Sequence, residues 1–251
     1  MIDTRRAVAD LKTIESIAMM TRVSSTNSVA QRIVAECVAN DLSLPQAMII
    51  AGEQYAGRGR NQRNWSSPAG KGIYATTLLT RSARDLALIP LEMANIVASF
   101  LRDRFAIDAR VKWPNDVLAN GRKIAGILIE ARVQEDRAFL IIGTGVNVEP
   151  VTEESTSIHE LAPDRFRGLE EATLAFIEHV DAQLARPLAR DRVLGEWRSM
   201  TIHSPGDRIT SVINDRRISG TWIGIDDEGR ALIHDGSVTL AISAGELITD
   251  N

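Results

Sequence analysis

Three arginines stand close together in the glycine-rich stretch GEQYAGRGRNQRNW, residues 52–65, and no acidic residue follows Glu53 within it. Its glycines let the backbone fold tightly around a ligand, because glycine adopts conformations that other residues avoid. Arg58, Arg60 and Arg63 can each give bidentate hydrogen bonds to the oxygens of a phosphate or carboxylate. The whole chain has a formal net charge of −4. The loop is therefore a local exception, and it predicts a binding site for a small anion.

Other interpretations of this loop stay open. An exposed basic loop can contact nothing, or it can bind nucleic acid, although the net charge of −4 and the lack of a longer basic stripe weigh against nucleic acid. The loop is not a P-loop, because Arg58 stands where that motif needs lysine and Gly59 where it needs a hydroxyl. The pair Gly57 and Gly59 also lacks the third glycine of a dinucleotide-binding fingerprint.

The segment KWPND, residues 112–116, is a second candidate for chemistry. Only four of the 29 basic residues are lysines, and Lys112 is one of them. A lysine ammonium is a compact charge on a flexible stem, whereas arginine is a planar fork, so the two are not interchangeable at a crowded site. Asn115 and Asp116 have side chains that can hydrogen-bond a base or hold Mg²⁺. We expect this segment and the arginine loop to face one pocket.

A third candidate is GTGVNV, residues 143–148, where glycines permit close approach of a flat ligand and the amide of Asn147 can pair with a purine edge. No nucleophile stands out, since Cys37 lies on the inward face of a predicted helix and no Ser or Asp has an adjacent histidine. The chemistry expected is positioning and charge neutralisation. Phosphoryl and nucleotidyl transfers are well served by both.

Secondary structure must place these candidates together. Short apolar runs predict strands at 46–51 and 73–80, so the arginine loop connects two strands. The polar cluster SSTN, residues 24–27, predicts a helix that begins near Thr26 or Asn27. Helical spacing also covers 86–104 and 169–200, where Pro187 separates two helices.

Residues 110–148 predict three strand-like segments, RVKW with VLA, RKIAGILIEARV and AFLIIGTGVNV. Asn120-Gly121 favours a type I′ hairpin and QEDR a second turn. Consecutive hairpins favour an α+β fold, with helices packed on a mixed, largely antiparallel sheet, over a doubly wound parallel one. Four or five short strands after residue 204, with turns at 214–215, 227–229 and 235–236, predict a small barrel. The expected domains are therefore 1–203 and 204–251.

Length and composition limit the classes of protein to which the chain can belong. At 251 residues the chain is long enough for one large or two unequal domains. No apolar run approaches the roughly 20 residues of a membrane helix, so no membrane association is expected. The four histidines are too dispersed for the short spacing of a zinc site. A single cysteine and no signal-like segment predict a reducing cytoplasm.

Five segments in this order closely resemble the biotin protein ligase family: SSTN, QYAGRGRNQRNW, KWPND, KIAGILIE and GTGVNV. The similarity spans roughly residues 20–250. It implies an ATP-dependent ligase that makes biotinyl-5′-AMP from biotin and MgATP, then passes biotin to a lysine of a carboxylase biotin carrier domain. It also implies that the C-terminal barrel is SH3-like. Only about 20 residues precede SSTN, so we expect the form without an N-terminal DNA-binding domain, and no DNA partner.

The resemblance assigns roles position by position. The residues expected to bind biotin are Ser25, Thr26, Asn27, Gln54, Arg58, Gly59, Arg60, Lys112 and Gly126. The residues expected to bind ATP are Arg60, Arg63, Trp65, Lys112, Asn115 and Asn147. Lys112, with Arg58 and Arg60, is the expected catalytic group that holds the biotin carboxylate against the α-phosphate. Asp116 is the candidate for contact with Mg²⁺ or for orienting Lys112. Lys123 can be either a site residue or a structural residue at the rim of the site.

Rival functions remain at this stage. A lipoate or octanoate ligase of the related superfamily uses the same kind of acyl-adenylate step, although KWPND and GRGRNQRNW argue against it. A nucleic-acid-binding module and a catalytically inactive biotin sensor are the other two alternatives. The oligomeric state stays open, with a homodimer as one option.

Overall fold

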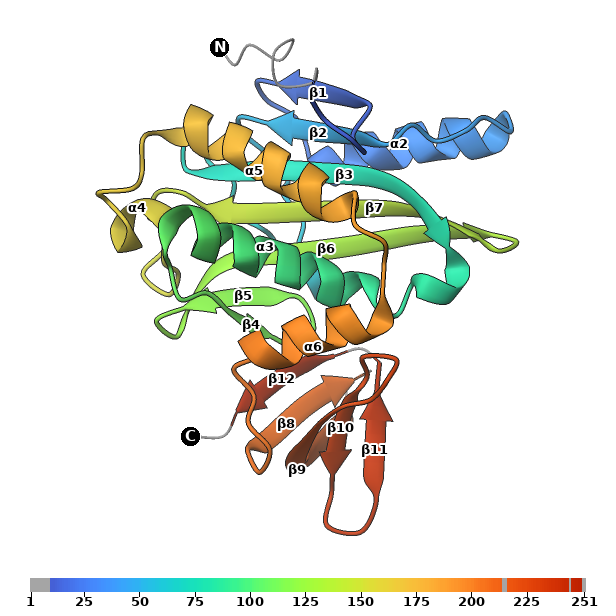
Figure 1. Cartoon of the computed structure of the whole chain (residues 1–251), viewed down its shortest axis with the longest axis vertical. Coiled ribbons are helices and arrows are strands. Elements are labelled where there is room, and N and C mark those ends of the chain that lie inside the picture. Colours follow the sequence, from blue (N-terminus) through green and yellow to red (C-terminus); the bar gives the residue numbers. More distant parts are fainter. Residues whose placement is uncertain (1–9, 214–215, 244, 250–251) are drawn as a thin grey trace.

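A computed structural model describes residues 10–213, 216–243 and 245–249 (Figure 1). The larger part is built on a seven-stranded sheet with the strand order β1-β2-β3-β7-β6-β5-β4. The strands are β1 (Ser16–Met20), β2 (Ala47–Ala51), β3 (Gly72–Ser82), β4 (Arg110–Lys112), β5 (Asp116–Ala119), β6 (Arg122–Gln134) and β7 (Arg137–Asn147). β1 and β2 are parallel and the other neighbouring pairs are antiparallel. The expected α+β class with a mixed, largely antiparallel sheet is confirmed.

Helices cover both faces of this sheet. They are α2 (Thr26–Ala39), α3 (Ile89–Phe105), α4 (Ile158–Leu161), α5 (Leu169–Leu184) and α6 (Arg190–Met200), with short 3-10 turns η1 (Arg60–Gln62) and η2 (Ala83–Asp85). In β2, Ile49 belongs to the core under α2, whereas Met48 and Ile50 belong to the core shared with α3. Both faces of β2 are therefore buried, which explains its unbroken apolar run.

The helices and hairpins expected around the candidate motifs are present. α2 begins at Thr26 and α3 carries Pro90 in its first turn. Asn120 and Gly121 both have positive φ, 49° and 74°, as a type I′ turn requires.

Two details of the sequence-based prediction were wrong. The segment RVKW with VLA is not one strand but two, β4 and β5, which pair with each other so that Lys112 lies opposite Asp116. Pro114 between them has no amide N–H to continue a ladder, so the chain turns there. The strand β1 and the helix α4 were not predicted at all.

The C-terminal residues form a second sheet, which is five-stranded and antiparallel, as expected for an SH3-like unit. Its strands are β8 (Arg208–Ile213), β9 (Arg216–Ile225), β10 (Ala231–His234), β11 (Thr239–Ile242) and β12 (Glu246–Thr249). The expected turn at 214–215 lies outside the described residues. In Figure 1 this sheet lies directly below α6.

The two sheets share one apolar core. Trp222 of β9 is 1% exposed and lies against Trp197 of α6, with ring centroids 6.4 Å apart. The indole Nε1 of Trp113, next to Lys112, donates a hydrogen bond to the carbonyl of Gly229 at 3.0 Å. The turn between β9 and β10 therefore touches the KWPND turn directly.

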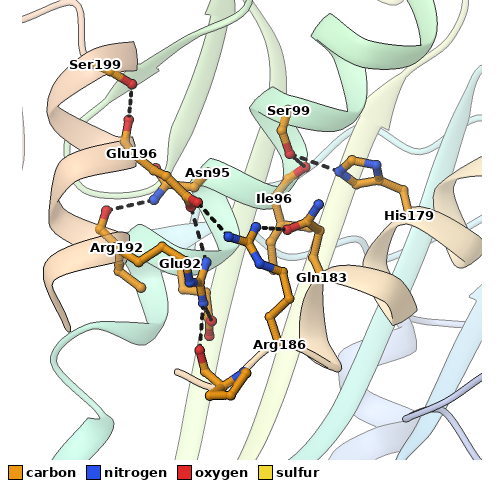
Figure 2. A network of polar contacts seen from close by, with 12 residues as sticks. Glu92, Asn95, Ile96, Ser99, His179, Gln183, Arg186, Arg192, Glu196 and Ser199 are labelled. Carbon is orange, nitrogen blue, oxygen red and sulfur yellow. Dashed lines mark hydrogen bonds and ion pairs between the residues drawn. The ribbon is translucent and has the colours of Figure 1, made fainter. Parts of the chain in front are cut away.

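A polar network joins α3, α5 and α6, and Ser99 of α3 contacts His179 of α5 within it (Figure 2). Glu92 of α3 is 4% exposed, and its carboxylate lies 3.2 Å from Nη2 of Arg192. Arg192 also pairs with Glu196 at 3.2 Å, and Asn95 donates to the Val193 carbonyl at 2.9 Å. Burial raises the pKa of Glu92, while Arg192 opposes that shift.

Among the described helices, none is long and apolar enough to cross a membrane.

We predict that Arg192→Met lowers the free energy of unfolding by about 3–5 kcal/mol, because it leaves the Glu92 carboxylate buried without its cation. Urea denaturation at pH 7 measures this. The double variant Glu92→Met with Arg192→Met is expected to recover most of the loss, since it removes both charges. An equal loss in the single and double variants would contradict the pairing.

Candidate active site

A cavity of about 260 Å³ lies where the arginine loop, the start of α2, the KWPND turn and strands β6 and β7 meet. Thirteen of the fourteen sequence-predicted site residues line it: Ser25, Thr26, Asn27, Gln54, Arg58, Gly59, Arg60, Arg63, Trp65, Lys112, Asn115, Asp116 and Gly126. Asn147 is not part of this lining. Its side-chain Nδ2 instead donates to the Thr156 carbonyl at 3.1 Å. Its expected contact with adenine stays a prediction.

Positive charge dominates the cavity wall. Its lining holds the five cationic side chains of Arg58, Arg60, Arg63, Lys112 and Lys123, against the single carboxylate of Asp116. Like charges gathered in a cleft raise the local concentration of oppositely charged ligands. The cavity therefore favours an anion, although the whole chain carries a formal charge of −4.

The arginine loop is folded by its own backbone. The amide of Gly59 donates to the Arg63 carbonyl at 2.7 Å, and the amide of Trp65 donates to the Gly57 carbonyl at 3.0 Å. Asn61 at the tip has a left-handed φ of 52°. A Cβ at Gly57 would overlap the Trp65 carbonyl, so only glycine fits there. The loop is a small hairpin that presents its arginines to the cavity.

The start of α2 supplies a hydrogen-bonded polar wall. The backbone amide and hydroxyl of Thr26 both donate to Oε1 of Gln54, at 2.8 and 3.1 Å. Gln54 in turn donates to the Ser67 hydroxyl at 2.8 Å. Ser25 precedes the helix but forms no side-chain cap, and it lines the cavity.

Thr76 is one of the functional residues that the sequence analysis missed. It lies fully buried in β3, and its hydroxyl oxygen is 2.7 Å from Oγ1 of Thr26 and 2.6 Å from Oδ1 of Asn27. A threonine within the apolar strand IYATTLLT was the signal available.

Glu130, at the end of the quoted KIAGILIE segment, is another missed residue. Its carboxylate pairs with Arg58 of the loop at 2.8 Å and accepts a hydrogen bond from Asn27 of α2 at 2.9 Å. The signal was an acidic residue that closes an apolar strand. Its partners are too distant in sequence for local pattern to reveal.

The KWPND turn is tied to the loop through an amide. Nη1 of Arg60 donates to Oδ1 of Asn115 at 2.7 Å, and Nδ2 of Asn115 bonds the Ile127 carbonyl of β6. Asn115 is 8% exposed. A neutral amide holds Arg60 here, so the charge of this arginine is not cancelled by that contact.

The two lysines of the cavity differ in their partners. Lys123 pairs with Asp116 at 2.7 Å, and its ammonium lies 5.2 Å from the ring centroid of Trp65. Lys112 has no hydrogen bond or ion pair through its ammonium within the described part of the chain. Asp116 therefore holds Lys123 rather than Lys112, and Lys112 keeps its donors for a ligand.

Magnesium is the remaining expected ligand of this cavity. The described residues contain no cluster of three or more histidine, cysteine or acidic side chains that could hold a metal ion. Mg²⁺ in ATP-dependent enzymes is commonly bound through one or two carboxylates together with substrate phosphates. Asp116 fits that arrangement as the single carboxylate of the lining.

Glycines in β6 and β7 make room for the flat indole of Trp65. A Cβ at Gly126 or at Gly145 would overlap that indole, and a Cβ at Gly143 would overlap the amide of Asn27. A flat ligand was expected to approach the sheet at such glycines. In this structure the side chains of Trp65 and Asn27 lie against them.

Two buried donors in the cavity lining have no partner among the described residues, Nε of Arg58 and Nε1 of Trp65. A buried N–H without an acceptor costs about 1–3 kcal/mol. Both donors belong to the arginine loop, so the loop without a ligand leaves two N–H groups unsatisfied by the described residues.

His203 supports the KWPND turn from behind. It is 4% exposed, its Nε2 accepts the backbone N–H of Trp113 at 3.2 Å, and its ring lies 4.8 Å from that of Trp222. Burial, reinforced by Lys112 and opposed by Asp207, lowers the pKa of His203 to about 4. The imidazole is therefore neutral at pH 7, as this acceptor role requires. The dispersed histidines of the sequence gave no sign of it.

The cationic cavity is a site for an anionic ligand, and comparison with known families gives the class of protein. The Biotin/lipoate A/B protein ligase family matches residues 20–147, and the chain belongs to this family. The biotin–acetyl-CoA-carboxylase ligase of Mycobacterium tuberculosis is 30% identical over 90% of this chain and 87% of its own length. The bifunctional ligase/repressor BirA of Bacillus subtilis is 29% identical over 84% of this chain and 67% of its own.

Solved structures show the same fold. The biotin protein ligase from Aquifex aeolicus, in complex with biotin and ATP, superposes with a TM-score of 0.73 at 24% identity. The match covers 94% of this chain and 99% of the other.

We predict that acid destabilises the protein through His203. The unfolded chain takes up this proton below a pH of about 6.5, whereas the folded protein resists it down to about 4, so stability falls with pH in that interval. The loss attributable to His203 is about 3 kcal/mol. His203→Gln removes it, as urea denaturation at pH 7, 5.5 and 4 would show. His159→Gln, at a half-exposed histidine, is the control. An unchanged pH dependence in His203→Gln would contradict the assignment.

Proposed function

We propose that the chain is a biotin protein ligase, which activates biotin with MgATP to biotinyl-5′-AMP and passes biotin to a specific lysine of a carboxylase biotin carrier domain. The observation that carries this proposal is the cavity itself, where five cations and two unpaired donors surround a space lined by the family's motif residues. Membership of the Biotin/lipoate A/B protein ligase family supports it.

The first half-reaction joins two anions. An oxygen of the biotin carboxylate forms a bond to the α-phosphorus of ATP, and the bond to pyrophosphate breaks. Arg58 and Lys112 neutralise the charge that the two reactants bring together, and fixed cations in a partly closed site do this without reorganisation. Asp116 would contact the Mg²⁺ that ATP brings, and the ion would add to the neutralisation of the phosphates.

The second half-reaction transfers biotin. The amine of the carrier lysine attacks the acyl carbonyl, AMP leaves, and the new amide nitrogen loses a proton. Lys112 stabilises the departing AMP as it stabilised the acid earlier. The hairpin of the arginine loop, with Trp65 beside the cavity, shields the adenylate from water between the two steps.

Finer properties are proposals of the same kind. The polar head of biotin is bound by Ser25, Thr26, Asn27 and Gln54. ATP is bound by Arg60, Arg63 and Asn115. The division into 1–203 and 204–251 is supported by the strand pairing, because β8 to β12 pair among themselves. The cytoplasm is the proposed location. The homodimer and the lack of a DNA partner remain predictions.

Exchange of labelled pyrophosphate into ATP tests the proposed activity. Purified protein with Mg²⁺ is assayed with biotin, with lipoate and with no added acid. Exchange that depends on biotin supports the proposal. Exchange with lipoate alone places the activity in the lipoate branch of the family, and no exchange contradicts an adenylating enzyme.

We predict that Lys112→Ala lowers both half-reactions by about 100- to 1,000-fold while biotin binding changes much less, because the ammonium acts where charge develops. Pyrophosphate exchange, transfer from added biotinyl-5′-AMP, and calorimetric biotin binding give the three readouts. Lys71→Ala, at an exposed lysine outside the cavity lining, is the matched control. Near-normal turnover in Lys112→Ala would refute this role.

A further inference from the structure

Glu130 is a carboxylate beside a site that must attract anions. It comes from β6 and is partly exposed, with a side-chain exposure of 28%. One oxygen, Oε2, lies 2.8 Å from Nη2 of Arg58 and 2.9 Å from Nδ2 of Asn27. The other, Oε1, accepts from Gln31 at 2.8 Å. On charge alone, a carboxylate here weakens the binding of an anionic substrate, so its placement needs another reason.

The pairing leaves part of the Arg58 guanidinium available. Arg58 has five N–H donors in a rigid fork, and Glu130 engages it through Nη2. Nε of Arg58 is buried and has no acceptor among the described residues. Glu130 therefore fixes the plane of the guanidinium through Nη2, while Nε stays without an acceptor among the described residues.

The same oxygen fixes the amide of Asn27. Nδ2 of Asn27 donates to Glu130, while Oδ1 accepts from the Thr76 hydroxyl at 2.6 Å and lies against Gly143. An amide has a donor end and an acceptor end, and a carboxylate accepts only from the donor end. Glu130 thus determines which way the Asn27 amide faces.

We propose that Glu130 is a positioning residue for the carboxylic acid substrate, which acts by joining Arg58 of the loop to Asn27 of α2. The proposal rests on the proposed function, since it assigns these two residues to opposite ends of the same acid. The subsite for the acid carboxylate and the subsite for its polar head are then set by one carboxylate oxygen. Loss of Glu130 uncouples them and misplaces the acid against ATP.

The substitution Glu130→Gln separates positioning from charge. It keeps the size of the side chain but removes the negative charge, so the amide oxygen that replaces Oε2 is a weaker acceptor for Arg58 and Asn27, and the N–H₂ group faces the amide of Gln31. A purely electrostatic role predicts tighter binding of the acid, because a repulsive charge is gone. Positioning predicts the opposite, a rise in the KM for biotin by about 10- to 100-fold, since small misplacements of bound reactants have effects of this size.

The experiment measures pyrophosphate exchange for KM and kcat with biotin and with ATP, together with calorimetric binding of biotin alone. We expect the KM for ATP to change by less than about threefold, and Glu130→Asp to recover part of the biotin affinity because it restores a carboxylate acceptor for Arg58 and Asn27. Glu171→Gln, which removes the acidic partner of Arg104 in a half-exposed pair outside the cavity lining, is the matched control. Thermal unfolding of each variant confirms that it is folded.

If Glu130→Gln binds biotin as tightly as the wild-type protein does, or more tightly, the positioning role is overturned and the proposed function stays intact. Equal rises in the KM for biotin in Glu130→Gln and Glu171→Gln would also overturn it. A wild-type protein that neither binds biotin nor catalyses exchange would overturn the proposed function, and the positioning role with it.

Discussion

Positive charge has to be concentrated in one small cavity without pairing every cation with a carboxylate of the protein. Five cations line that cavity, and like charges gathered in a partly desolvated site repel each other. The structure meets this constraint by giving different cations different partners. Asp116 pairs with Lys123, Glu130 holds Arg58 through one nitrogen, and a neutral amide holds Arg60. Lys112 is left without a carboxylate partner within the described part of the chain.

The rest of the fold keeps these groups in place. Glycines in β6 and β7 let the indole of Trp65 lie directly on the sheet, which fixes one end of the arginine loop. The turn between β9 and β10 and the segment that follows α6 hold the KWPND turn from the other side, because Trp113 donates through its indole to Gly229 and through its backbone to His203. Two segments that are 90 and 116 residues from Trp113 in sequence thereby hold the residue next to Lys112.

Local sequence pattern predicted what depends on local sequence. The capping cluster before Thr26, the Asn120-Gly121 turn and the apolar runs of β2 and β3 all correspond to elements of the structure. RVKW and VLA were grouped as one strand-like segment because both are short, and only the structure shows them as the paired strands β4 and β5 on either side of Pro114. Glu130 and His203 were missed for another reason. Each acts through a contact that spans 72 to 103 residues, and only the folded sheet brings those partners together.

The central claim is that one cavity holds the acid and ATP together against Lys112 and Arg58. A crystal structure with biotin and a non-hydrolysable ATP analogue tests it most directly. The account predicts the biotin carboxylate within about 3.2 Å of donors on Lys112 or Arg58, with Nε of Arg58 no longer unpaired. An acid bound elsewhere, with Lys112 and Arg58 unchanged, would contradict it.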